Sequence, residues 1–182
     1  MKKKILIIFL VLISFNAFSQ DNMITLSGGY AFANIEDSDE KGTGFSIKGN
    51  FEFNPLAGPL AHGITFGYVK LKATEMDGLQ EIEKTISSFP VYYAPKYMFG
   101  NDRMKAFIKG AIGMQYADLK RAGIVTTSDV DFGFYGGGGA GIMVFLTEAL
   151  FVNGEYEIAW ASNSSYKDGW INTFSGGLGF RF

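Results

Sequence analysis

Charged residues that alternate with apolar ones are the feature of this sequence most able to do chemistry. They recur at every second or fourth position of several segments, and such positions share one face of a β-strand. An unpaired charge in a confined interior is costly, so nearly equal numbers of basic and acidic side chains favour mutual pairing. We therefore predict an ionic network on one enclosed face, formed by Lys48, Lys96, Lys109 and Arg181 with Glu52, Glu155 and Glu157.

Other residues that could support catalysis or ligand binding are few. His62 is the only histidine, and the chain has no cysteine, hence no thiolate metal site and no disulfide. Gly136, Gly138 and Gly141 satisfy the spacing G-x-G-x-x-G, but the apolar residues that follow continue a strand, and no helix offers its N-terminus to a phosphate. These glycines are read instead as relieving crowding in a narrow barrel. Acidic clusters in the predicted loops are interpreted as solvated, so we expect no cofactor and no metal.

The N-terminus has the pattern of a secretory signal. Lys2 to Lys4 precede an apolar run, Ile5 to Phe15, that is too short to span a membrane as a helix, and Ala17 and Ser19 fit a cleavage site. We predict a signal peptide at residues 1–19 and one domain at residues 20–182. Removal of three lysines from 16 basic residues leaves 13 against 18 acidic ones, a net charge of −5, which argues against nucleic-acid binding.

Alternation with a period of two recurs through the whole mature chain and predicts eight strands. Their expected ranges are 23–34, 43–54, 61–72, 86–99, 104–117, 129–145, 149–161 and 170–182. The connections between them alternate in length, with long ones at 35–43, 73–85, 118–128 and 162–169. An even strand number with short and long connections in turn is typical of an all-β, eight-stranded antiparallel up-and-down transmembrane β-barrel with both termini in the periplasm.

The two faces of the predicted strands differ in polarity. One face is apolar and free of charge, while the other holds the lysines and glutamates at lower density than the wet face of a soluble barrel, so we place the apolar face outward. Pro90 and Pro95 each remove a ladder donor and predict a bulge or irregular pairing. Aromatic residues at the strand ends are expected at the membrane interfaces: Tyr68, Tyr116, Trp160 and Trp170 near the loops, and Phe53, Phe99, Phe180 and Phe182 near the turns.

The last strand ends in a polar residue, a glycine and two aromatic residues, Ser175, Gly177, Phe180 and Phe182. With the eight strands, this pattern resembles the small outer-membrane β-barrel family that includes the transmembrane domain of OmpA, OmpX and OmpW-like proteins. The resemblance implies that these four residues are read by the outer-membrane assembly machinery. It also implies an outer membrane of the Gram-negative type, with membrane lipids and lipopolysaccharide as partners, and no peptidoglycan-binding domain is expected after Phe182.

Two functions remain open at this point. The first is a non-enzymatic barrel with a filled interior, which displays surface loops for envelope integrity, adhesion or surface interaction. The second is a narrow porin-like channel for small or apolar solutes, in which the interior charges would meet lumen water alone. A lipid-modifying barrel enzyme is less favoured, because His62 lies beside a periplasmic turn rather than at the outer leaflet. The surface ligand is not identified by any motif.

Overall fold

The computed structural model describes residues 22–35, 41–54, 58–77, 80–122 and 127–182. The predicted signal peptide lies outside this part of the chain. No helix among the described residues is long and apolar enough to cross a membrane.

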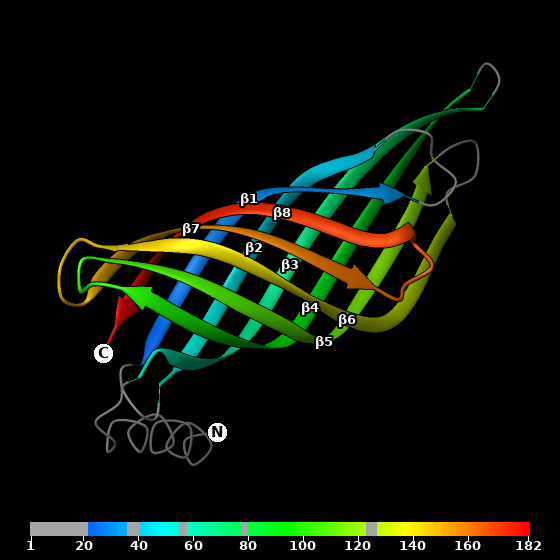
Figure 1. The fold of residues 1–182 in the computed structure, drawn as a ribbon. Coiled ribbons are helices and arrows are strands. Elements are labelled where there is room, and N and C mark those ends of the chain that lie inside the picture. Colours follow the sequence, from blue (N-terminus) through cyan, green and yellow to red (C-terminus); the bar gives the residue numbers. More distant parts are fainter. Residues whose placement is uncertain (1–21, 36–40, 55–57, 78–79, 123–126) are drawn as a thin grey trace, which may run out of the picture.

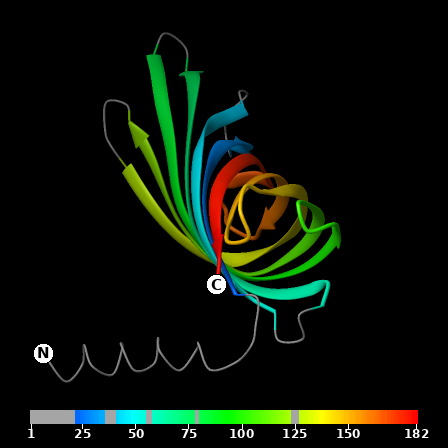
Figure 2. The same cartoon turned by 90° about the vertical axis from the view of Figure 1, so that its left-hand side faces the viewer.

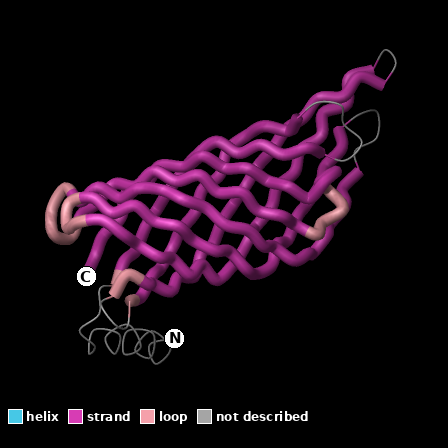
Figure 3. Tube along the Cα trace, viewed as in Figure 1, coloured by secondary structure: helices cyan, strands magenta, loops and turns pink. Residues whose placement is uncertain are grey.

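Eight antiparallel strands form a closed barrel in which sequence neighbours pair and β1 pairs with β8 (Figures 1 and 3). This confirms the predicted fold class. Closure is completed beyond the ladder, where the amides of Asn22 and Phe182 each donate to the carbonyl of the other at 3.0 and 2.9 Å. The strands are β1 (Met23–Ile35), β2 (Lys41–Phe53), β3 (Leu60–Asp77), β4 (Gln80–Gly100), β5 (Met104–Ala122), β6 (Thr127–Phe145), β7 (Leu150–Ala161) and β8 (Tyr166–Arg181).

Side chains alternate between the interior and the outer surface, with one register shift between β1 and β8 near the rim, at Ala33 and Ile35. On β1, Ala31 and Ala33 are buried, whereas Leu26 is 65% exposed. The same alternation on β5 buries Phe107 and exposes Ile108 and Ile112. Apolar residues therefore cover the outside, which is the arrangement of a barrel surrounded by lipid.

The two ends of the barrel differ. We call the end that holds the C-terminus the base and the opposite end the rim. At the rim, β3 to β6 extend well beyond the other four strands (Figure 2). Their lengths are 18, 21, 19 and 19 residues, against 12 to 16 for the others.

This extension corrects the predicted loops at 73–85 and 118–128, most of which are strand. The segments were read as loops because they are polar. A sheet that stands outside the membrane can be polar on its wet face, and opposite charges facing each other across strands stabilise it. Lys72 pairs with Glu83 at 2.6 Å and Arg121 with Asp129 at 2.9 Å in this way.

Two prolines interrupt the ladder of β4 without shifting its register. The pairing with β3 skips the position of Pro90, and the pairing with β5 skips that of Pro95. Register counting puts Gly67 opposite Pro90 and Gly110 opposite Pro95, and a Cβ on Gly67 would lie 2.8 Å from the Pro90 ring. Of the two expected outcomes, irregular pairing is found here rather than a bulge. The glycines leave room for the rings.

Candidate functional site

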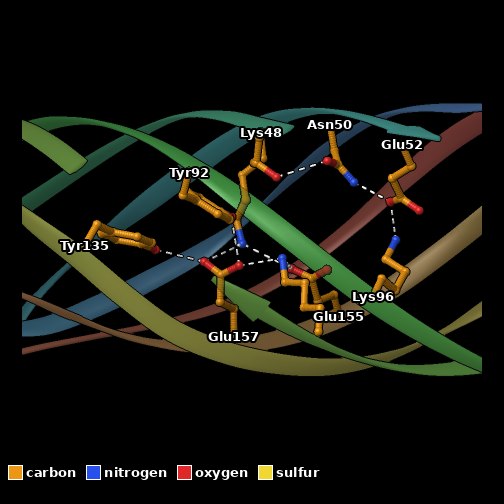
Figure 4. Close-up of polar contacts among 10 residues, drawn as sticks. Lys48, Asn50, Glu52, Tyr92, Lys96, Tyr135, Glu155 and Glu157 are labelled. Atoms are coloured by element: carbon orange, nitrogen blue, oxygen red, sulfur yellow. Dashed lines mark hydrogen bonds and ion pairs between the residues drawn. The ribbon is translucent and has the colours of Figure 1, made fainter. Parts of the chain in front are cut away.

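Four charged side chains from three strands meet at the centre of the barrel. Lys109 on β5 lies 2.7 Å from a carboxylate oxygen of Glu155 and 2.5 Å from one of Glu157, both on β7. Lys48 on β2 reaches the same two carboxylates at 3.2 and 3.1 Å. All four side chains are at most 8% exposed. The structure thus brings together four of the seven residues predicted to form the ionic network, and Figure 4 labels Lys48, Glu155 and Glu157 among them.

Two tyrosines complete the coordination of Glu157. The hydroxyl of Tyr92 donates to its Oε2 at 2.8 Å and that of Tyr135 to its Oε1 at 2.9 Å. Their rings stack with centroids 5.0 Å apart. Each oxygen of this carboxylate therefore has a tyrosine and a lysine as partners, which offsets the desolvation of a buried charge. Neither tyrosine is predicted from the sequence, although each falls on the inward parity of its strand.

A glycine explains how charges on non-adjacent strands make contact. Gly139 on β6 pairs with Lys109 on one side and with Glu157 on the other. A Cβ at Gly139 would lie 2.7 Å from the carbonyl oxygen of Tyr156 and 3.2 Å from Cε of Lys109. The glycine run that resembled a nucleotide motif lies in the middle of a strand and gives the ionic cluster its space.

A second ion pair lies nearer the base. Lys96 on β4 pairs with Glu52 on β2, and the amide of Asn50 donates to the same carboxylate. The Lys96 ammonium also stands 4.5 Å from the centroid of the Phe107 ring. Thr65 donates to Asn50 at 3.0 Å, so the polar residues form a layer of their own.

Arg181 does not join either group in the described part of the chain. Its guanidinium stacks 5.0 Å from the ring centroid of Phe145. Met23 is the register partner of both Arg181 and Glu52, and its buried side chain stands between them. Lys96 reaches Glu52 from the other side, so the arginine takes an aromatic partner at the base.

Apolar clusters close the interior on both sides of the polar layers. Toward the base lies a cluster of Met23, Ala61, Met98, Phe107, Met143 and Phe151. Toward the rim lies a larger one that includes Ile35, Leu71, Ile86, Tyr166 and Ile171. The cavity between the polar layers, lined by residues such as Asn153 and Thr25, has a volume of about 20 Å³. That is room for about one water molecule.

The residues predicted to guide assembly divide between the two faces of β8. Ser175 is buried and Gly177 faces inward, where a Cβ would lie 2.5 Å from the carbonyl oxygen of Leu26. Phe180 and Phe182 face outward, each 48% exposed. Close packing thus requires the glycine whether or not a receptor reads it.

The aromatic residues predicted near the loops lie on the outer surface toward the rim, and those predicted near the turns lie exposed toward the base. Tyr68 contacts Phe89 and Phe45 with ring centroids 5.0 and 5.8 Å apart, and Tyr116 follows Phe89 at 6.1 Å. On the opposite wall Trp160 pairs in register with Trp170.

His62 lies near the base, partly exposed on the outer surface. Its Nδ1 is 2.5 Å from the hydroxyl of Tyr93, and its ring stacks on Phe53 with centroids 5.3 Å apart. Neither contact supplies the serine or carboxylate of a hydrolytic triad.

Three solved structures of small barrels resemble this one. Neisserial surface protein A (NspA) aligns with a TM-score of 0.65 and 12% identity over 88% of this chain and 97% of that one. The attachment invasion locus protein Ail of Yersinia pestis aligns with a TM-score of 0.55 and 19% identity, over 89% of this chain and 99% of that one. The outer membrane enzyme PagL aligns with a TM-score of 0.50 and 17% identity, over 86% of this chain and 97% of that one. At such identities the likeness concerns the fold.

A search of curated protein sequences found no match. The family model of the outer membrane protein beta-barrel domain, in contrast, matches residues 5–182. The closed eight-stranded barrel and its apolar outer surface agree with that match. This chain therefore belongs to the family of the outer membrane protein beta-barrel domain.

Proposed function

We propose that this protein is a non-enzymatic outer-membrane barrel whose filled interior makes it a rigid scaffold for surface recognition at the rim. The class of role is adhesion, envelope integrity or another surface interaction. The observation that carries the proposal is the interior: two ionic layers between two apolar clusters, with a cavity of only about 20 Å³. A channel for solutes would require both apolar clusters and the ion pairs to move aside.

The extended strands at the rim favour recognition by a sheet. Residues 127–134 of β6 pair with β5 alone, because the pairing of β6 with β7 begins at Tyr135. Part of this edge is capped, since the amide of Phe134 donates to Ser162 and that of Ser164 to Asp131. The remaining edge, around Val130, offers backbone groups to an extended peptide, which is a common mode of protein recognition.

The proposal is tested by trimming the rim without disturbing the barrel. Ala117 and Asp131 face each other in register, as do Thr74 and Glu83. Replacing 118–130 and 75–82 each by Asn-Gly therefore shortens both hairpins with a turn that suits paired strands, and it removes the open edge around Val130. A control variant receives Asn-Gly in place of Thr147 and Glu148 at the base. Cells that carry each variant are compared for binding to other cells, to matrix proteins and to abiotic surfaces.

We expect the trimmed barrel to fold and to lose surface binding, while the base variant keeps it. Purified wild-type protein in a planar bilayer should show no steady current. Undiminished binding by the trimmed variant would show that the rim is not the recognition surface. A steady single-channel current would favour the solute channel instead.

A further inference from the structure

The outer surface of β3 to β5 changes character abruptly near the rim. Tyr68, Phe89 and Tyr116, together with Phe45 on β2, form an aromatic belt on adjacent strands. Between the base and this belt, the outward positions of β4 and β5 carry no charged residue in the described ranges. The belt therefore marks the upper border of the apolar surface on this wall.

Lysines stand immediately above the belt. Lys70 follows Tyr68 by two residues on β3, so it faces outward about 7 Å further toward the rim. Lys72 lies one further step up. Lys120 on β5 is in the same cross-strand row as Lys72, through Thr85. A protein with an excess of acidic residues thus places three lysines on one small area of its outer face.

Lys70 differs from the other two in its partners. Lys72 pairs with Glu83 at 2.6 Å and Lys120 with Asp118 at 3.6 Å. No carboxylate among the described side chains lies within ion-pair distance of Lys70. Its register partners are Phe45 and Ser87, so an aromatic ring and a hydroxyl flank it. Asp118, which follows Ser87 in the same row, is already engaged by Lys120 and by the hydroxyl of Ser128. The row thus presents the Lys70 ammonium and the Ser87 hydroxyl at the level where acyl chains give way to headgroups.

We infer that Lys70, with Ser87 and Lys72, binds the phosphate of an outer-leaflet lipid whose acyl chains lie along the apolar surface below the aromatic belt. Ammonium groups form short, strong hydrogen bonds with phosphate oxygens. The position of Lys70 directly above a continuous apolar surface favours a lipid over a soluble anion, because only a lipid satisfies both regions at once. This goes beyond the proposed role of the rim and does not depend on it.

The test uses purified barrel in phosphatidylcholine nanodiscs that contain diphosphorylated lipid A or the same lipid without phosphates. Native mass spectrometry then counts the lipid retained after release from the disc. The variants are Lys70→Gln, Glu83→Gln and, as a matched control, Lys167→Gln, which removes an exposed lysine on the opposite wall near the rim. Resistance of each variant to detergent before heating verifies that it is folded.

The wild type should retain the phosphorylated lipid in preference to the dephosphorylated one. Lys70→Gln should lower that preference about tenfold, as expected for loss of one charge-assisted hydrogen bond. Glu83→Gln should raise retention because it frees Lys72, and Lys167→Gln should leave it unchanged. Equal retention by wild type and Lys70→Gln would overturn the inference. Displacement of the lipid by inorganic phosphate would also overturn it, since that result indicates a soluble-anion site.

Discussion

At the scale of single residues, Lys109 carries the most consequential contacts of the interior. It lies within 2.7 Å of carboxylates from both Glu155 and Glu157. In Lys109→Met, Lys48 alone would have to neutralise two buried carboxylates. We expect the free energy of unfolding to fall by about 3–5 kcal/mol, as for other broken buried ion pairs. The measurement is urea unfolding in lipid vesicles.

A matched substitution separates this effect from the general loss of a lysine. Lys120 is 58% exposed, and its pair with Asp118 is screened by water. Lys120→Met should change stability by no more than about 1 kcal/mol. If both variants unfold at the same urea concentration, the central pairs contribute little and the lysines are hydrated individually.

Gly139 offers a second test at this scale. A Cβ there would meet a backbone oxygen at 2.7 Å, which cannot move without disturbing the ladder. Gly139→Ala should therefore destabilise the barrel by about 1–3 kcal/mol, the usual effect of overpacking. Gly154, on the neighbouring strand, has open space at its Cβ position. Gly154→Ala should be neutral or slightly stabilising in the same unfolding experiment, and an equal loss in both variants would mean that crowding around Lys109 is not the cause.

At the scale of elements, β8 closes the barrel against β1 and also carries the predicted assembly signal. One pair of variants can separate these two roles. Phe182→Ala keeps the backbone bonds with Asn22 but removes an exposed ring. Deletion of residues 180–182 removes the backbone bonds with Asn22 as well as the exposed ring. We expect Phe182→Ala to reduce the amount of folded barrel in the outer membrane, and the deletion to reduce it further. Leu178→Ala, which trims another outward side chain of β8, serves as the control.

The amount of heat-modifiable protein in membrane fractions measures this outcome. Normal levels of Phe182→Ala would show that the terminal ring is not read during assembly. If Leu178→Ala lowered the amount of folded barrel as well, the effect would come from any loss of apolar outer surface rather than from the terminal ring.

The pair of Lys72 and Glu83 connects β3 to β4 in the extension at the rim. A hydrogen bond and the positive charge of Lys72 lower the pKa of the Glu83 carboxyl below its ordinary value. Because the pKa of Glu83 is lowered in the folded state, the pair contributes fully to folding stability at pH values above the ordinary pKa. That contribution disappears as the pH falls through the lowered pKa. A carboxyl NMR titration should show this low pKa in the wild type and its return toward the ordinary value in Lys72→Gln. An unshifted Glu83 in the wild type would mean that the pair does not persist in solution.

Strands were predictable from the sequence where one face is apolar. From the base to the aromatic belt the alternation of side chains gives both the strand and its orientation, as on β5 with Phe107 inward and Ile108 outward. Beyond the belt both faces carry polar residues, so period and polarity no longer distinguish a strand from a loop. The extension of β3 to β6 depends on cross-strand pairs, such as Lys72 with Glu83, that only the register brings together.

The interior shows a similar division. Parity along each strand groups Lys48, Lys109, Glu155 and Glu157 on one face, and the structure brings them into contact. Parity does not give the height of each residue in the closed barrel, so Arg181 was grouped with residues from which Met23 separates it. The two tyrosines are not predictable because an inward tyrosine is expected to pack by its large apolar ring. Its hydroxyl becomes a necessary donor only where a buried carboxylate lies within reach.

At the scale of the whole molecule, closed hydrogen bonding predicts resistance to detergent. Every strand of the barrel pairs on both sides, including β1 with β8. Unboiled and boiled samples should therefore migrate differently in a denaturing gel, and the membrane-bound protein should begin at Gln20. Mass spectrometry of the N-terminal peptide checks the second point. Recovery of a peptide with Lys2 to Lys4 from the membrane would refute cleavage, and identical migration would argue against a stable closed barrel.

The partners within the ionic cluster are far apart along the chain, and this has a consequence for the order of folding. Lys48 belongs to the first part of the barrel, whereas Glu155 follows 107 residues later and Glu157 later still. A half-formed sheet entering the membrane would carry bare lysines on β2 and β5 toward hydrocarbon, which is strongly unfavourable. Pairing with the carboxylates of β7 therefore favours entry of a complete barrel into the bilayer over entry of a partial sheet.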